Sequence, residues 1–383
     1  MRRVLVVGAG PGGLAAALAV RRAGLEPVVV DRSRPSDPVG TGLTLWPNAL
    51  SALAALGVDG PVRDAGFPAQ GNQIRTPDGT VLDDVPADLM RERFGGTGIT
   101  LSRAELVGAL LDRLGPDTVR TPARCVGYRT DGARVYACFA DGTEEAGDVL
   151  VGADGLRSVI RAQLHDGGAR LRYAGYPVWR GTAGYPLGPA PGVLTMGRAA
   201  QFGLFPMRGD RVYWFATVPM PEGRAATVAA RAMLIERFGG WHPPVGAVLA
   251  ATGPERIVVT DIYDRPPLRR WGRGRVTLLG DAAHPSTPNL GQGTCQAFED
   301  AAVLGWCLAR ESEVDGALWR YERIRRPRAD ALTAQARRLG QLGQWGNPLA
   351  CWLRAELIRH LPRGPRTRQL ARMFTGPVEI DPG

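Results

Sequence analysis

The sequence predicts an α/β fold in which a parallel sheet with flanking helices is interleaved with a mostly antiparallel sheet and followed by a C-terminal helical segment. Two observations lead to this prediction. Near the N-terminus, a valine-rich run, a glycine-rich break, an Ala/Leu-rich run and a second valine-rich run follow one another, which is the order of a βαβ unit. Between residues 170 and 265, short alternating runs hold many aromatic residues, which is typical of antiparallel strands.

The N-terminal βαβ unit is the first element in chain order. Residues 2–7 and 27–30 are short apolar runs rich in β-branched residues, so they predict strands that are buried on both faces. Residues 14–23 between them predict a helix, because alanine and leucine dominate and a glycine follows at once.

The elements that follow have local signals of their own. Residues 102–114 predict a helix, because Ser102 and Glu105 have the spacing of a capping box. Residues 133–151 alternate around an Asp-Gly pair and predict a β-hairpin. The remaining predicted elements are strands at 192–206, 211–218 and 274–280, helices at 225–238 and 292–309, and a mostly helical stretch at 315–374 with breaks at Pro327, Pro348 and Pro362.

The composition is that of a globular protein with an unusual choice of basic residue. The chain has 383 residues, of which 44% are hydrophobic and 22% are charged, which argues against disorder. The net charge is +10, but the arginines are spread along the chain, so we expect no nucleic-acid partner. The densest run, from Arg323 to Arg328, is interpreted as a solvated helix face. The sequence holds no lysine, which excludes Schiff-base chemistry.

Cysteines, histidines and apolar runs limit the metal, redox and membrane classes. The five cysteines form no CxxC pair and only four histidines are present, so we expect no metal centre and a reducing compartment. No run of about 18 apolar residues occurs, so we expect no transmembrane segment. These observations together predict a cytoplasmic protein, which would be a monomer or a homodimer.

A glycine-rich motif stands between the first predicted strand and the first predicted helix. Gly8, Gly10 and Gly13 form GxGxxG, with Gly12 beside the last glycine, and Asp31 follows 18 residues after Gly13. The first glycine makes a tight turn, the second admits a pyrophosphate, and the third lets helix and strand pack closely. The helix N-terminus offers N–H groups to phosphates, and the acid suits ribose hydroxyls. The motif predicts a Rossmann-like dinucleotide-binding domain without deciding between FAD and NAD.

Two distant segments resolve that choice. Residues 148–161 read DVLVGADGLRSVIR, and residues 274–301 read GRVTLLGDAAHPSTPNLGQGTCQAFEDA; each is an apolar strand with an acidic residue just after it, followed by a helix. Together with GxGxxG, they resemble the three fingerprints of the class A flavoprotein monooxygenases, the para-hydroxybenzoate hydroxylase-like family. The stretches GTGLTLWPNAL, LSRAEL, GYPVWRG and GQGTCQAFEDA are similar to the branch that holds FAD-dependent urate hydroxylase, salicylate hydroxylase and zeaxanthin epoxidase. The resemblance covers about residues 1–335.

The resemblance implies which residues bind FAD. Asp281 would bind the ribitol hydroxyls, Arg103 the pyrophosphate, and residues 291–293 would present N–H groups to the N1/C2=O edge of the flavin. Pro288 would line the pocket near the point of oxygen addition, and Asp154 would lie near the pyrophosphate. The implied FAD-binding residues are Gly8, Gly10, Gly12, Gly13, Asp31, Arg32, Arg103, Val126, Asp154, Asp281, Pro288, Gly291, Gln292, Gly293 and Thr294.

Several residues in these segments have a structural interpretation beside the functional one. Asp154 and Asp281 could each cap a following helix. His284 is interpreted as a hydrogen-bonding loop residue, Arg161 as the partner of a nearby carboxylate, and Cys295 as a small packing residue.

The two sheets are expected to belong to interleaved domains. The FAD-binding domain is divided into three parts and the substrate-binding domain into two. The predicted parts are residues 1–75, 97–168 and 269–335 for the FAD-binding domain, 76–96 and 169–268 for the substrate-binding domain, and 336–383 for the C-terminal helical segment.

The resemblance also implies an activity. NADPH or NADH would serve as a transient reductant and O2 as co-substrate, and FAD would activate oxygen at its C4a position for insertion of one atom into the substrate. No second glycine fingerprint for the nicotinamide cofactor is present, which agrees with transient binding. A small aromatic or polyene substrate is expected, either hydroxylated or epoxidised, with a role in secondary metabolism such as antibiotic biosynthesis.

The substrate is expected to lie between the flavin and the antiparallel sheet. Urate is not expected, because the urate hydroxylases carry an arginine at the place that corresponds to Gln201. Arg180 could anchor an anionic substrate or could be an exposed strand residue. The candidate pocket residues are Trp46, Trp179, Arg180, Gln201, Phe205, Tyr213, Trp214 and Pro288.

Other functions stay open at this point. A non-oxygenating FAD-dependent reductase or dehydrogenase would act without O2, and a redox-inert binding protein would show no turnover. The C-terminal helices are expected to pack on the body, although a pocket cap, a dimer surface and contact with a membrane are further possibilities. Their large apolar residues are Trp345, Leu349, Trp352, Leu353, Leu357 and Ile358.

Overall fold

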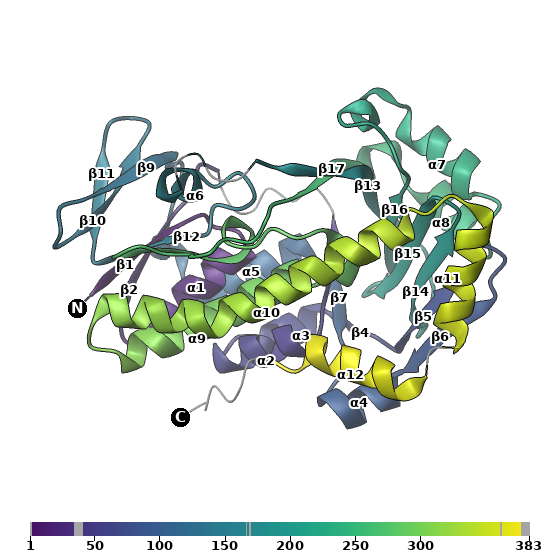
Figure 1. Ribbon diagram of the computed structural model, residues 1–383, viewed down its shortest axis with the longest axis horizontal. Coiled ribbons are helices and arrows are strands. Elements are labelled where there is room, and N and C mark those ends of the chain that lie inside the picture. Colours follow the sequence, from purple (N-terminus) through teal and green to yellow (C-terminus); the bar gives the residue numbers. More distant parts are fainter. Residues whose placement is uncertain (1, 34–40, 166, 168–169, 361, 377–383) are drawn as a thin grey trace.

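The parallel sheet has five strands in the computed structural model, which describes residues 2–33, 41–165, 167, 170–360 and 362–376 (Figure 1). The strand order is β18-β12-β1-β2-β8, and every neighbouring pair is parallel. The carboxyl ends of β18, β12 and β1 therefore lie side by side at one edge of the sheet. The strands are β1 (Arg3–Val7), β2 (Glu26–Val30), β8 (Val119–Arg120), β12 (Val149–Gly152) and β18 (Val276–Leu278).

Helices α1 (Pro11–Arg22), α5 (Arg103–Leu114) and α9 (Gly293–Arg310) lie beside this sheet, and α1 packs against both α5 and α9. The Ala/Leu-rich α1 is almost wholly buried, and small residues let α9 approach it closely. A Cβ on Gly305 would lie 2.7 Å from the Cβ of Ala19. The capping box predicted at the start of α5 is confirmed, because the side chains of Ser102 and Glu105 each accept a hydrogen bond from the backbone N–H of the other residue.

The second large sheet has seven strands in the order β17-β13-β16-β15-β14-β5-β6 and is antiparallel except between β14 and β5. Helices α7 (Ala230–Phe238) and α8 (Val245–Ala251) cover its outer face. Its strands are β5 (Gly71–Arg75), β6 (Val81–Pro86), β13 (Arg172–Gly184), β14 (Gly192–Gly197), β15 (Ala200–Met207), β16 (Arg211–Thr217) and β17 (Val258–Asp264).

Two details of this sheet differ from the sequence prediction. Residues 192–206 form two strands rather than one, because the chain turns at Arg198-Ala199, where Ala199 has a φ of 48°. Strand β5 belongs to this sheet, although residues 71–75 fall within the first predicted part of the FAD-binding domain. The β5 sequence is too short and too polar to reveal its sheet partner.

The smaller elements connect the two large sheets. One three-stranded sheet, β3-β7-β4, lies between them. In a second, β11-β10-β9, strands β10 and β11 form the hairpin predicted within residues 133–151. Their strands are β3 (Gly42–Leu45), β4 (Phe67–Pro68), β7 (Ile99–Ser102), β9 (Cys125–Thr130), β10 (Val135–Phe139) and β11 (Glu144–Gly147). The remaining short helices are α2 (Pro47–Ala55), α3 (Asp59–Ala65), α4 (Ala87–Phe94), α6 (Val159–Leu164) and the 3-10 turns η1 (Pro116–Thr118), η2 (Arg224–Thr227), η3 (Pro254–Arg256), η4 (Gly280–Ala282) and η5 (Pro288–Leu290).

Helix α10 (Val314–Gly343) runs along the molecule from the parallel sheet to the seven-stranded sheet (Figure 1). Pro327 lies inside it, so the helix break predicted there is wrong. A proline inside a helix costs about 3 kcal/mol, and on either side of this one Arg325 and Arg328 form ion pairs with residues of α9. The other two prolines do mark boundaries, since Pro348 begins α11 (Pro348–His360) and Pro362 precedes α12 (Arg363–Phe374).

The last helix returns to the body of the protein. Met373 and Phe374 are buried against Met90, Leu290 and Leu332, so the predicted packing of the C-terminal segment is confirmed for α12. None of the helices in the described ranges combines the length and the apolar composition that a membrane crossing requires.

Candidate functional site

The glycine-rich loop after β1 packs directly on the loop after β12. Gly8 has a φ of +111°, and a Cβ there would lie 2.7 Å from the carbonyl carbon of Ala153. A Cβ on Gly13 would overlap the carbonyl oxygen of Gly8. Both positions therefore exclude every larger residue, because the obstacles are backbone atoms that side-chain rotation cannot move. The first and second sequence fingerprints meet at this point.

Arg161 joins the second fingerprint to the third. Its side chain is 1% exposed and donates hydrogen bonds to the carbonyl oxygens of Ala282 (3.0 Å) and Ala283 (2.8 Å). Burial, together with nearby Arg265, lowers its pKa to about 10, so the guanidinium is still charged at neutral pH. Its partners are carbonyl groups, and the expected carboxylate partner is wrong. The contact fixes the loop that carries Asp281.

Asp154 caps the helix that follows it. Its Oδ2 accepts hydrogen bonds from the backbone N–H groups of Val159 (2.7 Å) and Ile160 (3.4 Å), and burial raises its pKa. The structural interpretation of this residue is therefore confirmed. A contact of Asp154 with a pyrophosphate stays a prediction.

Arg103 lies beside the glycine-rich loop, and Asp281 lies beside the first turn of α9. The Nη2 atom of Arg103 lies 3.7 Å from the position that a Cβ on Gly10 would occupy, and the Oδ1 atom of Asp281 lies 4.0 Å from the corresponding position on Gly293. Both side chains are exposed, and no hydrogen bond or ion pair occupies either of them within the described part of the chain. Desolvation by the surrounding protein atoms lowers the pKa of Arg103 and raises the pKa of Asp281, the latter against the effects of His284 and Arg103. Two exposed charged groups thus lie beside the glycine-rich loop and the start of α9.

Two helix N-termini point into the same region. Helix α1 begins after Gly10 and α9 begins after Gln292, and in both helices no side chain caps the first turn and no acidic residue lies in it. Their first N–H groups carry partial positive charge and need partners, which phosphate or carbonyl oxygens provide. Thr294 lies in the first turn of α9 and is half-buried.

The other residues that the resemblance assigns to FAD differ in their contacts and exposure. The Asp31 carboxylate accepts a hydrogen bond from the N–H of Ala9 (2.7 Å) and therefore braces the glycine-rich loop. Arg32 is exposed, and Val126 on β9 is 52% exposed. Gly291 has a φ of +61°, and the Trp46 Nε1 atom lies 3.0 Å from where its Cβ would be. That indole nitrogen is buried and has no hydrogen-bond partner among the described residues.

The inner face of the seven-stranded sheet carries an aromatic cluster. Phe205, Tyr213 and Phe215 form this cluster, with ring centroids 6.1 to 6.5 Å apart. The Tyr213 ring lies on Gly42 of β3, where a Cβ would overlap the ring, and burial raises the pKa of Tyr213. The sheet register places Gln201 two residues before Gly203 on this same face, where its amide lies against Gly343 at the end of α10.

Trp179 and Trp214 lie on the opposite face. Both are 0% exposed and belong to the core between the sheet and helices α7 and α8, with Phe202 stacked on Trp214 at 5.7 Å. Successive strand residues point to opposite faces, so neighbours of Tyr213 and Arg180 face away from the aromatic cluster. These two tryptophans are therefore core residues, and their expected place in the pocket is wrong. Arg180 lies on the inner face and donates to the Thr260 hydroxyl at 2.9 Å.

The loop between β18, the third fingerprint strand, and α9 contacts the seven-stranded sheet. Tyr176 on β13 donates a hydrogen bond to Asn289 (2.6 Å), which holds η5 against the seven-stranded sheet. Pro288 is exposed at the start of this turn. The turn therefore lies between the start of α9 and the inner face of the seven-stranded sheet.

These features together fit FAD. A pyrophosphate needs a cradle without Cβ atoms, helix N–H groups and a cation, which Gly8 to Gly13, α1 and Arg103 offer. A polyhydroxylated chain needs an acceptor such as the unpartnered carboxylate of Asp281. An electron-rich ring edge needs donors such as the uncapped first turn of α9.

Comparison with known proteins agrees with this geometry. The sequence matches the FAD binding domain family over residues 1–336. Among solved structures, it is similar to Klebsiella pneumoniae HpxO complexed with FAD and uric acid, with a TM-score of 0.92, 31% identity, and coverage of 99% of this chain and 98% of that one. The chain belongs to the class A flavoprotein monooxygenases.

Two curated relatives of this monooxygenase have a named chemistry. It is 42% identical, over 93% of each chain, to the aurachin C monooxygenase/isomerase of Stigmatella aurantiaca. It is 34% identical, over 98% of this chain and 99% of the other, to the 2-heptyl-3-hydroxy-4(1H)-quinolone synthase of Pseudomonas aeruginosa.

The monooxygenase also contains a buried charge network that the sequence analysis missed. Arg325 is 0% exposed and donates to Asp300 (2.7 Å), Glu299 (2.5 Å) and the side chain of Gln296 (2.6 Å). The interpretation of the arginine run as a solvated face is therefore wrong for Arg325, and also for Arg328, which donates to Glu299 at 2.8 Å. The signal that could have revealed this is the acidic pair Glu299-Asp300 in the otherwise apolar α9.

The network reaches the residues beside the proposed flavin site. Asn48 donates to Glu299 (2.6 Å) and to Gln292 (2.9 Å), which precedes the first turn of α9. At its other end, Nε2 of His284 lies 2.6 Å from Asp300, so the interpretation of His284 as a hydrogen-bonding loop residue is confirmed. Burial alone would raise the pKa of Asp300, but His284 and Arg325 lower it to about 2. Cys295, near the start of α9, is fully buried and packs in the core, as expected.

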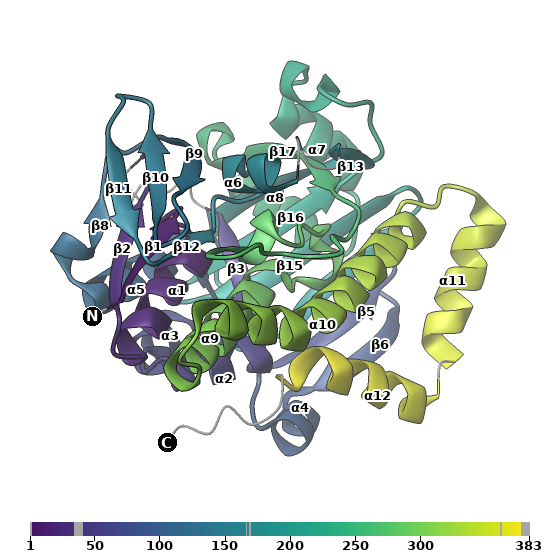
Figure 2. The same ribbon diagram turned by 60° about the vertical axis from the view of Figure 1, so that its left-hand side comes forward.

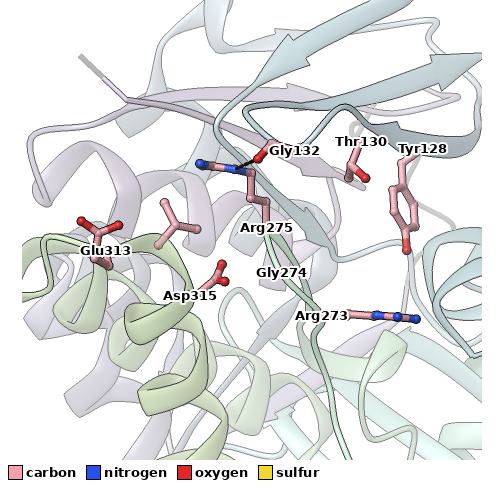
Figure 3. A pocket seen from close by; sticks show the side chains of 9 residues that line it. Tyr128, Thr130, Gly132, Arg273, Gly274, Arg275, Glu313 and Asp315 are labelled. Carbon is pink, nitrogen blue, oxygen red and sulfur yellow. Dashed lines mark hydrogen bonds between the residues drawn. The ribbon is translucent and has the colours of Figure 1, made fainter.

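A separate hollow of about 770 Å³ lies at the other end of the parallel sheet (Figure 3). It is formed by the β9–β10 region, the residues before β18 and the start of α10, so it is remote from the carboxyl ends of the strands where the glycine-rich loop lies. Its lining mixes both charge signs, and Arg275 is already hydrogen-bonded to the carbonyl of Gly132 (3.3 Å). The lining residues are Tyr128, Thr130, Gly132, Arg273, Gly274, Arg275, Glu313, Val314 and Asp315.

Proposed function

We propose that this monooxygenase hydroxylates a neutral, bicyclic heteroaromatic compound of the 4(1H)-quinolone type, with NADPH or NADH as reductant and O2 as co-substrate. The name of the Pseudomonas aeruginosa relative, which matches nearly the whole chain, supports this substrate class. A role in secondary metabolism, such as antibiotic biosynthesis, is part of the proposal.

The observation that carries the proposal is the chemistry of the inner sheet face. Phe205, Tyr213 and Phe215 offer flat apolar surfaces, which suit an aromatic ring system. Gln201 offers a neutral amide that can both donate and accept. The cation on this face, Arg180, is already hydrogen-bonded to Thr260. A neutral substrate with one carbonyl and one N–H group fits this set better than an anion does.

The residues of the chain would bind, orient and protect the reactants. When bound, FAD would accept electrons from NAD(P)H and use them to activate O2. Asp281 would hold its ribitol hydroxyls, Arg103 and the start of α1 its phosphates, and the start of α9 would stabilise negative charge on the ring. Trp46, which stacks on Phe374 of the C-terminal segment at 5.1 Å, would keep water from this region.

The test uses the FAD-loaded enzyme and a panel of aromatic compounds. A 2-alkyl-4(1H)-quinolone should stimulate NAD(P)H oxidation and O2 consumption, and oxygen from ¹⁸O2 should appear in the product. Urate, salicylate and 3-amino-4-hydroxybenzoate serve as comparison substrates. The proposal is wrong if one of these anions is preferred, or if a quinolone is converted under strict exclusion of O2, which would indicate a reductase or dehydrogenase.

A pair of variants separates substrate binding from other defects. Gln201→Leu should raise KM for the quinolone by about 10-fold or more, because a buried polar contact of the substrate is lost. Arg180→Gln should leave KM for a neutral substrate within about 2-fold. A larger effect of Arg180→Gln than of Gln201→Leu would indicate an anionic substrate instead.

A further inference from the structure

Helix α11 has its apolar face turned to solvent. Leu349, Trp352, Leu353 and Leu357 are 70%, 59%, 47% and 61% exposed. Their spacing of three and four residues places them on one side of the helix. Figure 2 shows α11 standing at the edge of the molecule, beyond the seven-stranded sheet. Packing of the C-terminal segment on the body therefore leaves this face uncovered.

The opposite side of α11 is attached to the body by an arginine. Arg354 is 6% exposed and donates hydrogen bonds to the carbonyl oxygens of Leu342 and Gly197, both at 2.8 Å. A surface helix normally buries its apolar side and exposes its charges. In α11 this order is reversed, so the exposed leucines and Trp352 are not the residues that hold the helix in place.

Basic residues flank the apolar face at both ends of the helix. At its C-terminal end, Arg359 and His360 are exposed, and both pair with Glu356 on the same helix, at 2.7 and 3.1 Å. At its N-terminal end, exposed Arg198 lies against the connecting turn, with its Nε atom 3.4 Å from the carbonyl of Gly346. The chain as a whole has a net charge of +10.

Exposed Arg237 extends the basic region at the N-terminal end. It donates to the carbonyl of Arg198 at 2.6 Å, and the backbone of the same turn is joined to Trp345 through the N–H of Ala199 (2.7 Å). Trp345 is itself 36% exposed. The apolar strip of α11 thus has arginines near both of its ends, and apolar residues combined with basic ones are typical of surfaces that lie in a membrane interface.

We propose that α11 docks on the surface of a membrane that contains anionic lipids, with Leu349, Trp352, Leu353 and Leu357 in the acyl boundary and the arginines at the headgroups. The charges favour this partner over a second copy of the chain, because pairing of two α11 faces would bring basic residues together. The helix has 13 residues and is about 20 Å long, so it lies on a bilayer rather than crossing it.

The experiment measures sedimentation of the FAD-loaded enzyme with vesicles. Vesicles of phosphatidylcholine mixed with phosphatidylglycerol should bind the enzyme more strongly than vesicles of phosphatidylcholine alone, and added salt should reduce the difference. The double variant Trp352→Gln/Leu353→Gln should lower the partition coefficient by about 10-fold or more, because both side chains insert in the boundary region. Flavin content and circular dichroism establish that the variant is folded.

Trp319 provides the matched control. It is 62% exposed on α10, with Arg323 over its ring at 5.2 Å, and it lies far along the chain from α11. Trp319→Gln should leave vesicle binding within about 2-fold, since loss of one exposed tryptophan elsewhere has no bearing on the docking face. Equal binding by the α11 variant and the wild type, or no binding to either vesicle, would overturn the proposal. So would a dimer in light scattering that the α11 variant dissociates, because the face would then be a subunit interface.

Discussion

Arg325 is the side chain whose replacement tests the buried network most directly. Substitution Arg325→Met keeps most of the volume and removes the charge. Asp300 then retains His284, and Glu299 retains Arg328 and Asn48, but each carboxylate loses its fully buried cation.

The magnitude follows from the burial of these groups. Breaking a buried ion pair by removing one partner costs about 3–5 kcal/mol, because the remaining charge stays desolvated. With an unfolding entropy of about 2.1 cal/mol/K per residue, a chain of 383 residues changes its Tm by about 1.2 °C per kcal/mol. Arg325→Met should therefore lower the Tm by about 4–6 °C.

Thermal unfolding followed by circular dichroism and by release of flavin measures this shift. Arg323→Met is the matched control, since Arg323 lies on the same helix, is exposed and contacts only the Trp319 ring in the described structure. It should change the Tm by less than about 1 °C. If Arg325→Met also changes the Tm by less than about 1 °C, the network does not stabilise the fold as argued.

The pH dependence of the difference provides a second check. The pKa of Asp300 is about 2 in the folded protein and 3.8 ordinarily, so the folded state binds this proton more weakly than the unfolded state does. Its contribution to stability is fully present above about pH 4 and is lost as the pH falls toward about 2. The difference in Tm between the wild type and Arg325→Met should therefore be constant near neutral pH and narrow on acidification below about pH 4. A difference that widens on acidification would contradict the assignment.

Three further substitutions test the cofactor site and the sheet faces. Gly13→Ala should abolish FAD retention, measured as flavin per protein after gel filtration, whereas Gly108→Ala, where nothing lies within 4 Å of the new Cβ, should retain it and raise stability by about 1 kcal/mol. Asp281→Asn should raise the Kd for FAD by about 10- to 100-fold in a fluorescence titration, because a charged acceptor is lost, and an unchanged Kd would remove it from the ribitol site. Trp179→Phe should leave a cavity that lowers the free energy of unfolding by about 1–3 kcal/mol, seen as a lower denaturation midpoint, and should leave KM within about 2-fold. A change in KM without a change in stability would instead place Trp179 in the substrate pocket.

The parts of this enzyme that the sequence predicted well have local signals. The capping box of α5, the Ala/Leu-rich α1 and the glycines at positions 8 and 13 depend on contacts within a few residues or on backbone approach that only glycine permits. Three ordered fingerprints then sufficed to identify the family, because each is a strand end with a defined residue at its tip.

The parts that the sequence did not predict depend on distant partners. Arg325 looks like its exposed neighbour Arg323 until α9 brings Glu299 and Asp300 against it. Trp179 illustrates the same limit for a strand, since alternation divides residues into two faces but does not tell which face is covered by helices. The helix break expected at Pro327 failed for a related reason, because Arg325 and Arg328 on either side of the proline pair with a distant helix that the local sequence does not reveal.

The continuity of α10 has a mechanical consequence. Its 30 residues correspond to a rod about 45 Å long, with Arg325 paired to Glu299 and Asp300 of α9 and Gly343 packed against Gln201 on the sheet. A rod transmits tilt with little loss, so a small rearrangement at the isoalloxazine end would displace the far end and the helix attached to it. Binding at α11 and binding beside Gln201 would thus be coupled mechanically through α10.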